Sequence, residues 1–187
     1  MYQPGSPETI VKTQETLHKL QRSPGGWQLA NSLSNHENQQ VRFFAALTFI
    51  VKLNTDAYVF RICLRKFIYL VSRKSLSEED SQTLLATLIN WLIRCLETSE
   101  GPLVLRKLCS TLVVFFFQFS SSWQNCVKHL IYCVYMRSAV PYESSQDAPD
   151  MHSMIRELPD TKAVVIFWFA STLVEEVGKT DSNSIKQ

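Results

Sequence analysis

The chain has 187 residues, of which 45% are hydrophobic and 19% are charged, and its formal net charge at pH 7 is +2. This hydrophobic share excludes a wholly disordered chain, and the small net charge gives no indication of a nucleic-acid partner. No stretch is long and apolar enough to predict a membrane span, which needs about 20 residues. Residues 1–8 are polar and do not resemble a secretory signal.

The predicted elements are helices separated by short polar breaks, and no segment shows the alternation typical of a strand. Ser6 and Pro7 start the first helix, because serine is a good N-cap and proline suits the first turn. Periodicity and breaks together predict helices over residues 7–21, 27–34, 37–54, 78–97, 103–119, 123–137, 151–158 and 161–178. The five cysteines lie within apolar runs, which favours buried, reduced thiols in an intracellular protein.

The predicted helix over residues 37–54 is the most informative, because apolar side chains cover two neighbouring faces of it. By the helical period, one face carries Val41, Phe44, Ala45, Thr48 and Val51, and the next carries Phe43, Leu47, Ile50 and Asn54. An ordinary surface helix has one apolar stripe and a broad polar face. A helix that is apolar nearly all round packs on several sides, as in a stacked array of helical hairpins.

Paired helices recur at a period of about 40 residues, which is typical of HEAT-type repeats. The expected pairs are 7–21 with 26–34, 37–54 with 78–97, and 102–119 with 122–137, while the last helix has no partner. We therefore predict an all-α chain, an α-solenoid of about three and a half HEAT-like hairpins. Residues 1–187 form a single array in this interpretation, with 57–75 an insertion, 138–159 a loop-rich linker and 179–187 a frayed tail.

Three segments resemble the N-terminal part of the importin-β (karyopherin-β) superfamily of nuclear transport receptors. They are Trp27-Gln28-Leu29-Ala30, Gln40-Val41-Arg42-Phe43-Phe44-Ala45-Ala46-Leu47-Thr48 and Leu105-Arg106-Lys107-Leu108-Cys109. The pattern is most similar to fungal members of the transportin-SR and importin-thirteen branch. The resemblance covers most of residues 7–54, 77–137 and 160–177, and members of that family are several times longer than this chain.

The resemblance implies a HEAT-repeat superhelix that shuttles between nucleus and cytoplasm. In that family the N-terminal repeats bind the GTP-bound form of the GTPase Ran, mainly through the second helix of each repeat. Phenylalanine-glycine (FG) nucleoporins bind the outer surface, and protein cargo engages other parts of the arch, which lie outside this chain. We also expect a monomer with no membrane partner. The alternative is a HEAT-repeat scaffold or adaptor that is unrelated to nuclear transport.

Residues 57–75 depart from this family pattern, because family members have a short link between the two helices at this position. The segment contains Arg61, Arg65, Lys66, Arg73 and Lys74 and no acidic residue. It could prolong the preceding helix or form a separate one, and we hypothesise that it is foreign to the original repeat. Its basic and aromatic side chains could also bind nucleic acid, although a solvated helix face is the simpler interpretation.

A narrow polar stripe on the predicted helix 78–97 is the best candidate for a partner-binding surface. If this helix is the second of its repeat, as the resemblance implies, the stripe faces the concave side; the alternative is ordinary solvent exposure. The stripe consists of Thr83, Thr87, Asn90, Arg94 and Glu97, and Gln124 and Lys128 occupy a similar place on the next second helix.

Sequence patterns typical of catalysis are missing. The chain contains no glycine-rich phosphate loop, nucleophile elbow or His-Glu-x-x-His motif, so we predict no catalytic residue, no cofactor and no enzyme activity. Cys126, His129 and Cys133 share one helix face and are the best metal candidate, but a fourth zinc ligand is missing, which favours a role in the core. The aromatic residues Phe115, Phe116, Phe117, Phe119, Phe167, Trp168 and Phe169 are also expected in the core.

Overall fold

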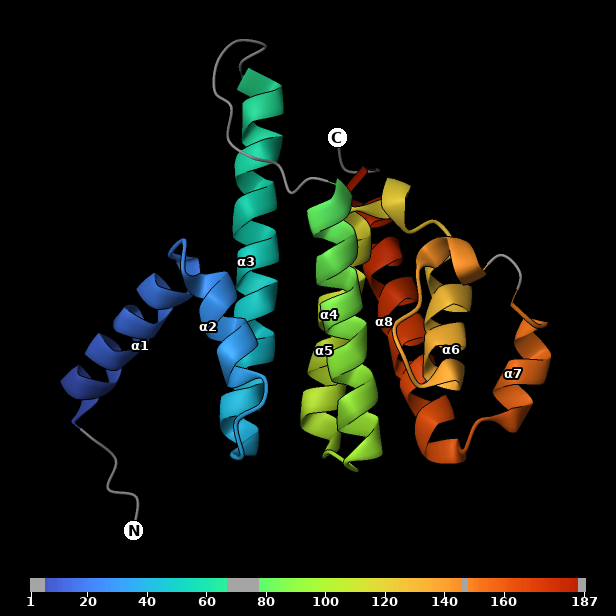
Figure 1. Cartoon of the computed structure of the whole chain (residues 1–187). Coiled ribbons are helices and arrows are strands. Elements are labelled where there is room, and N and C mark those ends of the chain that lie inside the picture. The colour runs from blue at the N-terminus through green and yellow to red at the C-terminus, as the bar shows by residue number, and fades with distance from the viewer. Residues whose placement is uncertain (1–5, 67–77, 146–147, 185–187) are drawn as a thin grey trace.

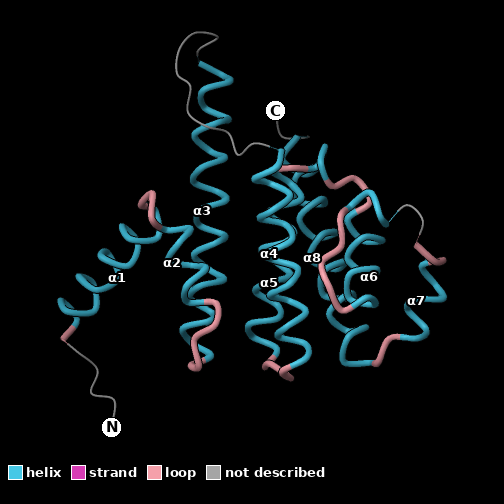
Figure 2. Tube along the Cα trace, viewed as in Figure 1, coloured by secondary structure: helices cyan, strands magenta, loops and turns pink. Residues whose placement is uncertain are grey.

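The computed structural model describes residues 6–66, 78–145 and 148–184, and for 56–66, 121 and 180–184 it describes the backbone alone. All elements in these ranges are helical, and loops connect them (Figure 2), which confirms the all-α prediction. The elements are α1 (Pro7–Arg22), α2 (Gly26–Leu33), α3 (Gln39–Lys66), α4 (Glu78–Glu97), α5 (Pro102–Gln118), the 3₁₀ turn η1 (Ser120–Ser122), α6 (Cys126–Met136), the 3₁₀ turn η2 (Tyr142–Ser145), α7 (Met151–Glu157) and α8 (Asp160–Ser184).

The helices are stacked side by side from α1 at one end of the molecule to α7 at the other (Figure 1). α3 packs against α5, and α5 packs in turn against α8, so that these three helices form one series. α4 and α6 contact each other and lie beside this series, and α2 covers α3 at the N-terminal end. α3 and α5, and likewise α4 and α6, are therefore neighbours in space although another helix separates them in the chain.

The expected pairing of helices needs correction in three places: α3 and α4 are not close backbone neighbours, α5 and α6 are not either, and the last helix, α8, for which the sequence predicts no partner, packs against α5. The backbone of α3 lies closest to α2 and α5, and its contact with α4 depends on large side chains rather than on close backbones. The rings of Phe49 and Trp91 bridge α3 and α4 with their centroids 5.9 Å apart. Aromatic side chains of this size hold the two helices apart, whereas the small residues Ala45 and Ala46 on α3 are completely buried.

Local sequence signals explain the ends of several helices. The Ser6 hydroxyl accepts a hydrogen bond from the Thr9 amide, and Pro7 occupies the first turn of α1, as predicted. Asp150 caps α7 by accepting from the amides of His152 and Ser153. Arg137 adopts a left-handed conformation with φ 56° and ends α6. These caps satisfy polar backbone groups that a helix end otherwise leaves unpaired.

Three predicted helix boundaries differ from the structure. α3 continues to Lys66, so the basic segment begins as an extension of this helix, and its end rises above the neighbouring helices in Figure 1. Residues 67–75 of the suspected insertion lie outside the described residues. α6 begins at Cys126, because residues 120–122 form a 3₁₀ turn before it. α8 continues past Gly178 to Ser184, since the exposed Gly178 and the Glu176–Lys179 ion pair both suit a solvated helix.

The aromatic core prediction is confirmed in its centre and wrong at its edge. Phe115, Phe169 and Trp123 are buried, with the Trp123 ring centroid 5.9 Å from that of Phe115 and 5.8 Å from that of Phe169. Phe167, however, is 69% exposed. Two residues along a helix turn the side chain by about 200°, so the burial of Phe169 against α5 and α6 directs Phe167 to the opposite face.

Gly26 begins α2 at a place where the backbone of α1 and the side chain of Lys52 leave no space. A Cβ on Gly26 would lie 2.5 Å from the carbonyl oxygen of Gln21 and 2.8 Å from Cδ of Lys52. At Gly25 the nearest atom would be the Ser23 hydroxyl oxygen, 3.8 Å away.

We expect Gly26→Ala to lower the free energy of unfolding by about 1–3 kcal/mol, because the clash involves backbone. Gly25→Ala is the matched control and should change the stability little, since Gly25 has right-handed helical backbone angles. Urea denaturation followed by circular dichroism measures both. Equal stabilities of the two variants would contradict this account of the α1–α2 junction.

Candidate partner-binding surface

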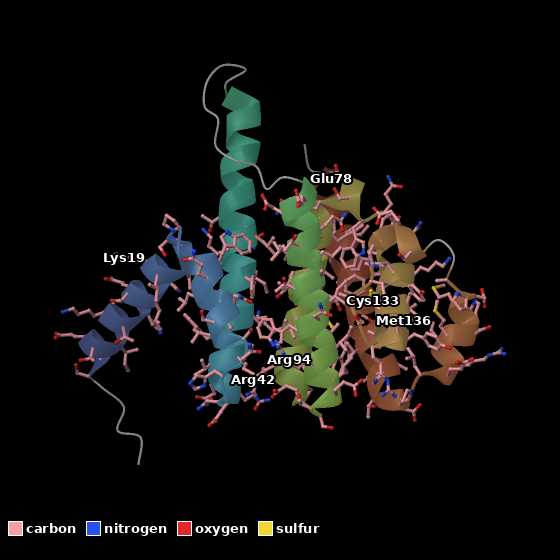
Figure 3. The ribbon with its side chains drawn as sticks, in the orientation of Figure 1. Lys19, Arg42, Glu78, Arg94, Cys133 and Met136 are labelled. Carbon is pink, nitrogen blue, oxygen red and sulfur yellow. The ribbon has the colours of Figure 1, made fainter. Side chains whose placement is uncertain are left out.

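The polar stripe predicted on α4 lies on the solvent-exposed side of this helix. Thr83, Asn90, Arg94 and Glu97 are exposed and Thr87 is half-buried, and Arg94 is labelled on the lower half of α4 in Figure 3. The rest of the helix is buried against its neighbours through Leu85, Leu88, Ile89, Trp91, Leu92, Ile93 and Cys95. Burial on three sides and one narrow exposed strip is the pattern that the sequence predicts.

Two members of the stripe bind other parts of the same molecule. The side-chain oxygen of Asn90 accepts a hydrogen bond of 2.9 Å from the Ala139 amide, which follows α6. A Glu97 carboxylate oxygen lies 2.6 Å from Nζ of Lys162, on the first turn of α8, and 3.9 Å from Nε of Arg137. The hydrogen bond from Lys162 holds the pKa of Glu97 below its ordinary value. Asn90 and Glu97 therefore fasten the chain after α6 onto α4.

The threonines of the stripe use their hydroxyl protons within α4. Thr83 donates to the Glu79 carbonyl at 2.9 Å, and Thr87 donates to the Thr83 carbonyl at 2.8 Å. Each hydroxyl oxygen keeps acceptor capacity for a partner. Thr83 and Arg94 are thus the exposed stripe residues other than Asn90 and Glu97.

The two residues expected on the following helix lie at its start. Gln124 is exposed, but it lies in the link between η1 and α6 rather than on a helix, because α6 begins two residues later. Lys128 is half-buried in the first turn of α6. A hydrogen bond of 3.2 Å from the Gln82 side chain to the Ser122 carbonyl connects the beginning of α4 to η1. Gln124 thus follows closely on a junction between η1 and the first turns of α4.

His129 is the centre of a buried hydrogen-bond network. Its Nδ1 atom accepts from the indole N–H of Trp123 at 2.8 Å, so its proton resides on Nε2 and is donated to the Val140 carbonyl at 2.9 Å. The Cys133 sulfur lies 3.4 Å from the same Nε2. Both ring nitrogens are engaged within the protein, and no group of three potential metal ligands occurs among the described residues. The network supports the core interpretation of Cys126, His129 and Cys133.

The network predicts a pH dependence of stability. Burial lowers the pKa of His129 from its ordinary value of 6.5, against weaker opposing effects of the Val140 carbonyl and Glu143. At a pH between the folded-state pKa of His129 and its ordinary value, the unfolded chain binds a proton that the folded protein does not. The contribution of the neutral His129 to stability is therefore complete above about pH 6.5 and is lost as the pH falls to the folded-state pKa. We expect the free energy of unfolding to decrease there by at most about 1.4 kcal/mol per pH unit.

Urea denaturation at a series of pH values measures this loss, and His129→Gln is the control, because glutamine does not titrate. The wild-type curve should steepen below about pH 6.5 while the curve of the variant should not. Parallel curves would show that His129 does not carry the effect.

The buried cysteines have the properties of structural thiols. Desolvation raises the pKa of Cys95, Cys126 and Cys133 to about 11 and that of Cys109 to about 12. The thiolate is the reactive form, so these four side chains are unreactive at neutral pH. The side chain of Cys63 lies outside the described set.

Several polar contacts between helices were not anticipated from the sequence. Arg42 on α3 forms an ion pair with Glu100, which lies in the turn between α4 and α5. Lys52 is only 3% exposed and donates a hydrogen bond of 3.2 Å to the Ser23 carbonyl. The guanidinium of Arg106 lies 4.8 Å from the centroid of the Trp168 ring. A charged residue within an apolar helix, such as Lys52, indicates a buried polar contact. The sequence does not identify its partner, because Ser23 lies 29 positions away.

Comparison of the chain with protein-family models, with curated protein sequences and with solved structures finds no match in any of the three. In the described part of the chain, no helix has the length and apolarity needed to cross a bilayer.

Proposed function

We propose that this chain is a protein-binding helical array of the HEAT type, and specifically a Ran-GTP- and nucleoporin-binding region of a nuclear transport receptor. The serial packing of α3, α5 and α8 beside a second layer containing α4 and α6 supports the proposal more than any other observation. A two-layer array of this kind offers extended surfaces for partners. In this proposal the protein is not an enzyme, and it moves between nucleus and cytoplasm.

The surface of α4 around Thr83 and Arg94, with Gln124 at the start of the next hairpin, is the proposed contact with Ran. Thr83 and Arg94 are exposed, and on the same face Asn90 binds the chain after α6 and Glu97 binds the first turn of α8. FG nucleoporins would bind the opposite layer, which contains α3, α5 and α8. Cargo would engage parts of a longer receptor.

A pull-down with Ran loaded with GTP or GDP tests the proposal. We expect capture of the GTP form only, and we expect Arg94→Glu to weaken it about tenfold, which corresponds to about 1.4 kcal/mol. Arg156→Glu makes the same charge change on the exposed face of α7 and should leave the binding unchanged. Capture that is independent of the nucleotide, or absent from both forms, would reject the transport receptor proposal.

The second candidate is a HEAT-repeat scaffold with partners unrelated to nuclear transport. It is favoured by the internal use of Asn90 and Glu97, which leaves a smaller exposed stripe than the sequence indicated. In that case Ran is not captured in either state, while Arg94→Glu still weakens the binding of other proteins. Nucleic-acid binding by residues 57–75 stays a prediction, because the basic side chains lie outside the described set.

A further inference from the structure

The outer face of α8 carries an apolar ridge. Val164, Phe167, Val174 and Val177 recur at helical spacing and are 38%, 69%, 71% and 42% exposed, respectively. The opposite face of the helix is buried against α5 and α6 through Val165, Ile166 and Phe169. Four neighbouring exposed apolar side chains on one helix face are typical of an interaction surface, whereas single exposed ones need no explanation.

The N-terminal end of the molecule contains a matching apolar groove. It is formed where α1, α2 and the first turns of α3 meet, has a volume of about 370 Å³ and is open to solvent. Two polar residues, Asn38 and Gln40, lie at its edge. Its apolar lining consists of Leu17, Leu20, Leu29, Leu33, Val41 and Phe44.

We propose that the ridge of one copy of this chain docks into the N-terminal groove of a second copy. The groove is large enough for the Phe167 ring and a neighbouring valine, since an apolar cavity of about 150 Å³ accommodates benzene. The most exposed aromatic side chain of the ridge would then be the anchor at the centre of the contact.

The charges beside the two surfaces are also complementary. Lys19 and Arg22 lie in the last turn of α1, next to the groove, and Glu175 directly follows Val174 on the ridge. Glu175 is exposed, while the adjacent Glu176 pairs with Lys179 of its own helix at 2.5 Å. A contact between Glu175 of one copy and Lys19 of the other would fix which way α8 lies across the groove.

The association is head-to-tail, because the ridge on α8 and the groove formed by α1, α2 and α3 are different surfaces at separate places on the molecule (Figure 1). A pair as a whole keeps one unused ridge, on one copy, and one unused groove, on the other, so further copies add as the concentration rises. The contact would extend the stacking of helices within one chain to stacking between chains. It departs from the monomer expected from the sequence, and it does not depend on the proposed transport function.

Sedimentation velocity of the full chain over a range of concentrations tests the proposal. We expect a weight-average mass that rises with concentration, and a contact of this limited size implies a dissociation constant on the order of micromolar or weaker. Phe167→Asp removes the ridge and Leu20→Asp removes the groove, so each variant alone should be monomeric. Ile155→Asp places the same charge on an exposed residue of α7 and should associate like the wild type.

A mixture of the two monomeric variants gives the decisive result. The Phe167→Asp chain retains a groove and the Leu20→Asp chain retains a ridge, so an equimolar mixture should form one-to-one dimers and nothing larger. Lys19→Glu and Glu175→Lys should each weaken the self-association. In a mixture of these two variants both kinds of contact between unlike chains join a positive and a negative charge, so an equimolar mixture should restore it.

Three outcomes would overturn the proposal. They are a wild-type mass that does not change with concentration, a mixture that stays monomeric, and association that one of the two aspartate variants leaves intact. Circular dichroism confirms that each variant is folded. Where an aspartate variant loses helix, Phe167→Ser or Leu20→Ser replaces it in the same assay, because serine removes the apolar contact without adding a charge.

Discussion

Replacing Trp123 with alanine is expected to lower the free energy of unfolding by about 3–5 kcal/mol. Trp123 is completely buried between α5, α6 and α8, and its ring packs against those of Phe115 and Phe169. The variant would leave a cavity at the junction of three helices and would also leave the Nδ1 atom of His129 without its donor. Urea denaturation followed by circular dichroism measures the loss.

Trp123→Phe separates the two contributions. It keeps an aromatic ring in the core but removes the indole N–H, so we expect a smaller loss of about 1–3 kcal/mol, mainly from the unpaired His129 nitrogen. Combining it with His129→Leu should restore part of the lost stability, because the buried acceptor is then absent as well. If the loss in free energy of unfolding of the double variant equals the sum of the losses of the two single variants, the hydrogen bond does not couple these residues.

Replacing Arg42 with alanine is expected to have a comparable effect, about 3–5 kcal/mol, for an electrostatic reason. The Arg42 guanidinium donates to the carbonyls of His36 and Glu37 at 2.5 and 2.7 Å and lies 2.5 Å from the Glu100 carboxylate. The side chains of Arg42 and Glu100 are only 18% and 9% exposed. Without Arg42, the Glu100 charge would stay largely buried and unpaired. Chemical denaturation is again the measurement.

Two further variants test whether the stability that Arg42 contributes depends on the geometry of its guanidinium group or on its charge alone. Arg42→Lys keeps the charge but cannot reach three acceptors in a fixed planar arrangement, so we expect an intermediate loss of about 1–3 kcal/mol. Lys179→Ala removes the exposed ion pair with Glu176 and should change the stability little, because surface pairs are well solvated. An Arg42→Ala variant as stable as Lys179→Ala would show that the buried pair does not hold the array together.

The Arg42–Glu100 pair and the Trp123–His129 pair both lie at contacts between helices, which connects them to the proposed binding surface. Arg42 fastens the start of α3 to the turn between α4 and α5, while His129 and Asn90 hold the adjacent residues Val140 and Ala139 of the segment after α6. The orientation of α4, and with it the exposure of Thr83 and Arg94, depends on these contacts. Loss of either pair should therefore also weaken partner binding.

The sequence by itself determined the helical elements and, for α4, the side that is buried. Helical periodicity, together with breaks such as Ser23 to Gly26, placed the helices to within a few residues, because both signals act over one or two turns. The same periodicity predicted the exposed stripe of α4 correctly. It could not show that α3 continues to Lys66, since the residues after Asn54 are compatible with a helix, an inserted segment or both.

Only the tertiary structure decided which helices are neighbours and which polar residues meet. The bonds between Lys52 and Ser23, Asn90 and Ala139, and Arg42 and Glu100 join residues far apart in the chain, and their sequence spacing carries no period. The same holds for Phe167, whose exposure depends on how α5 and α6 cover α8 rather than on its own hydrophobicity. Local periodicity gives a helix its buried face, but the identity of the residue opposite that face is fixed only when the helices pack.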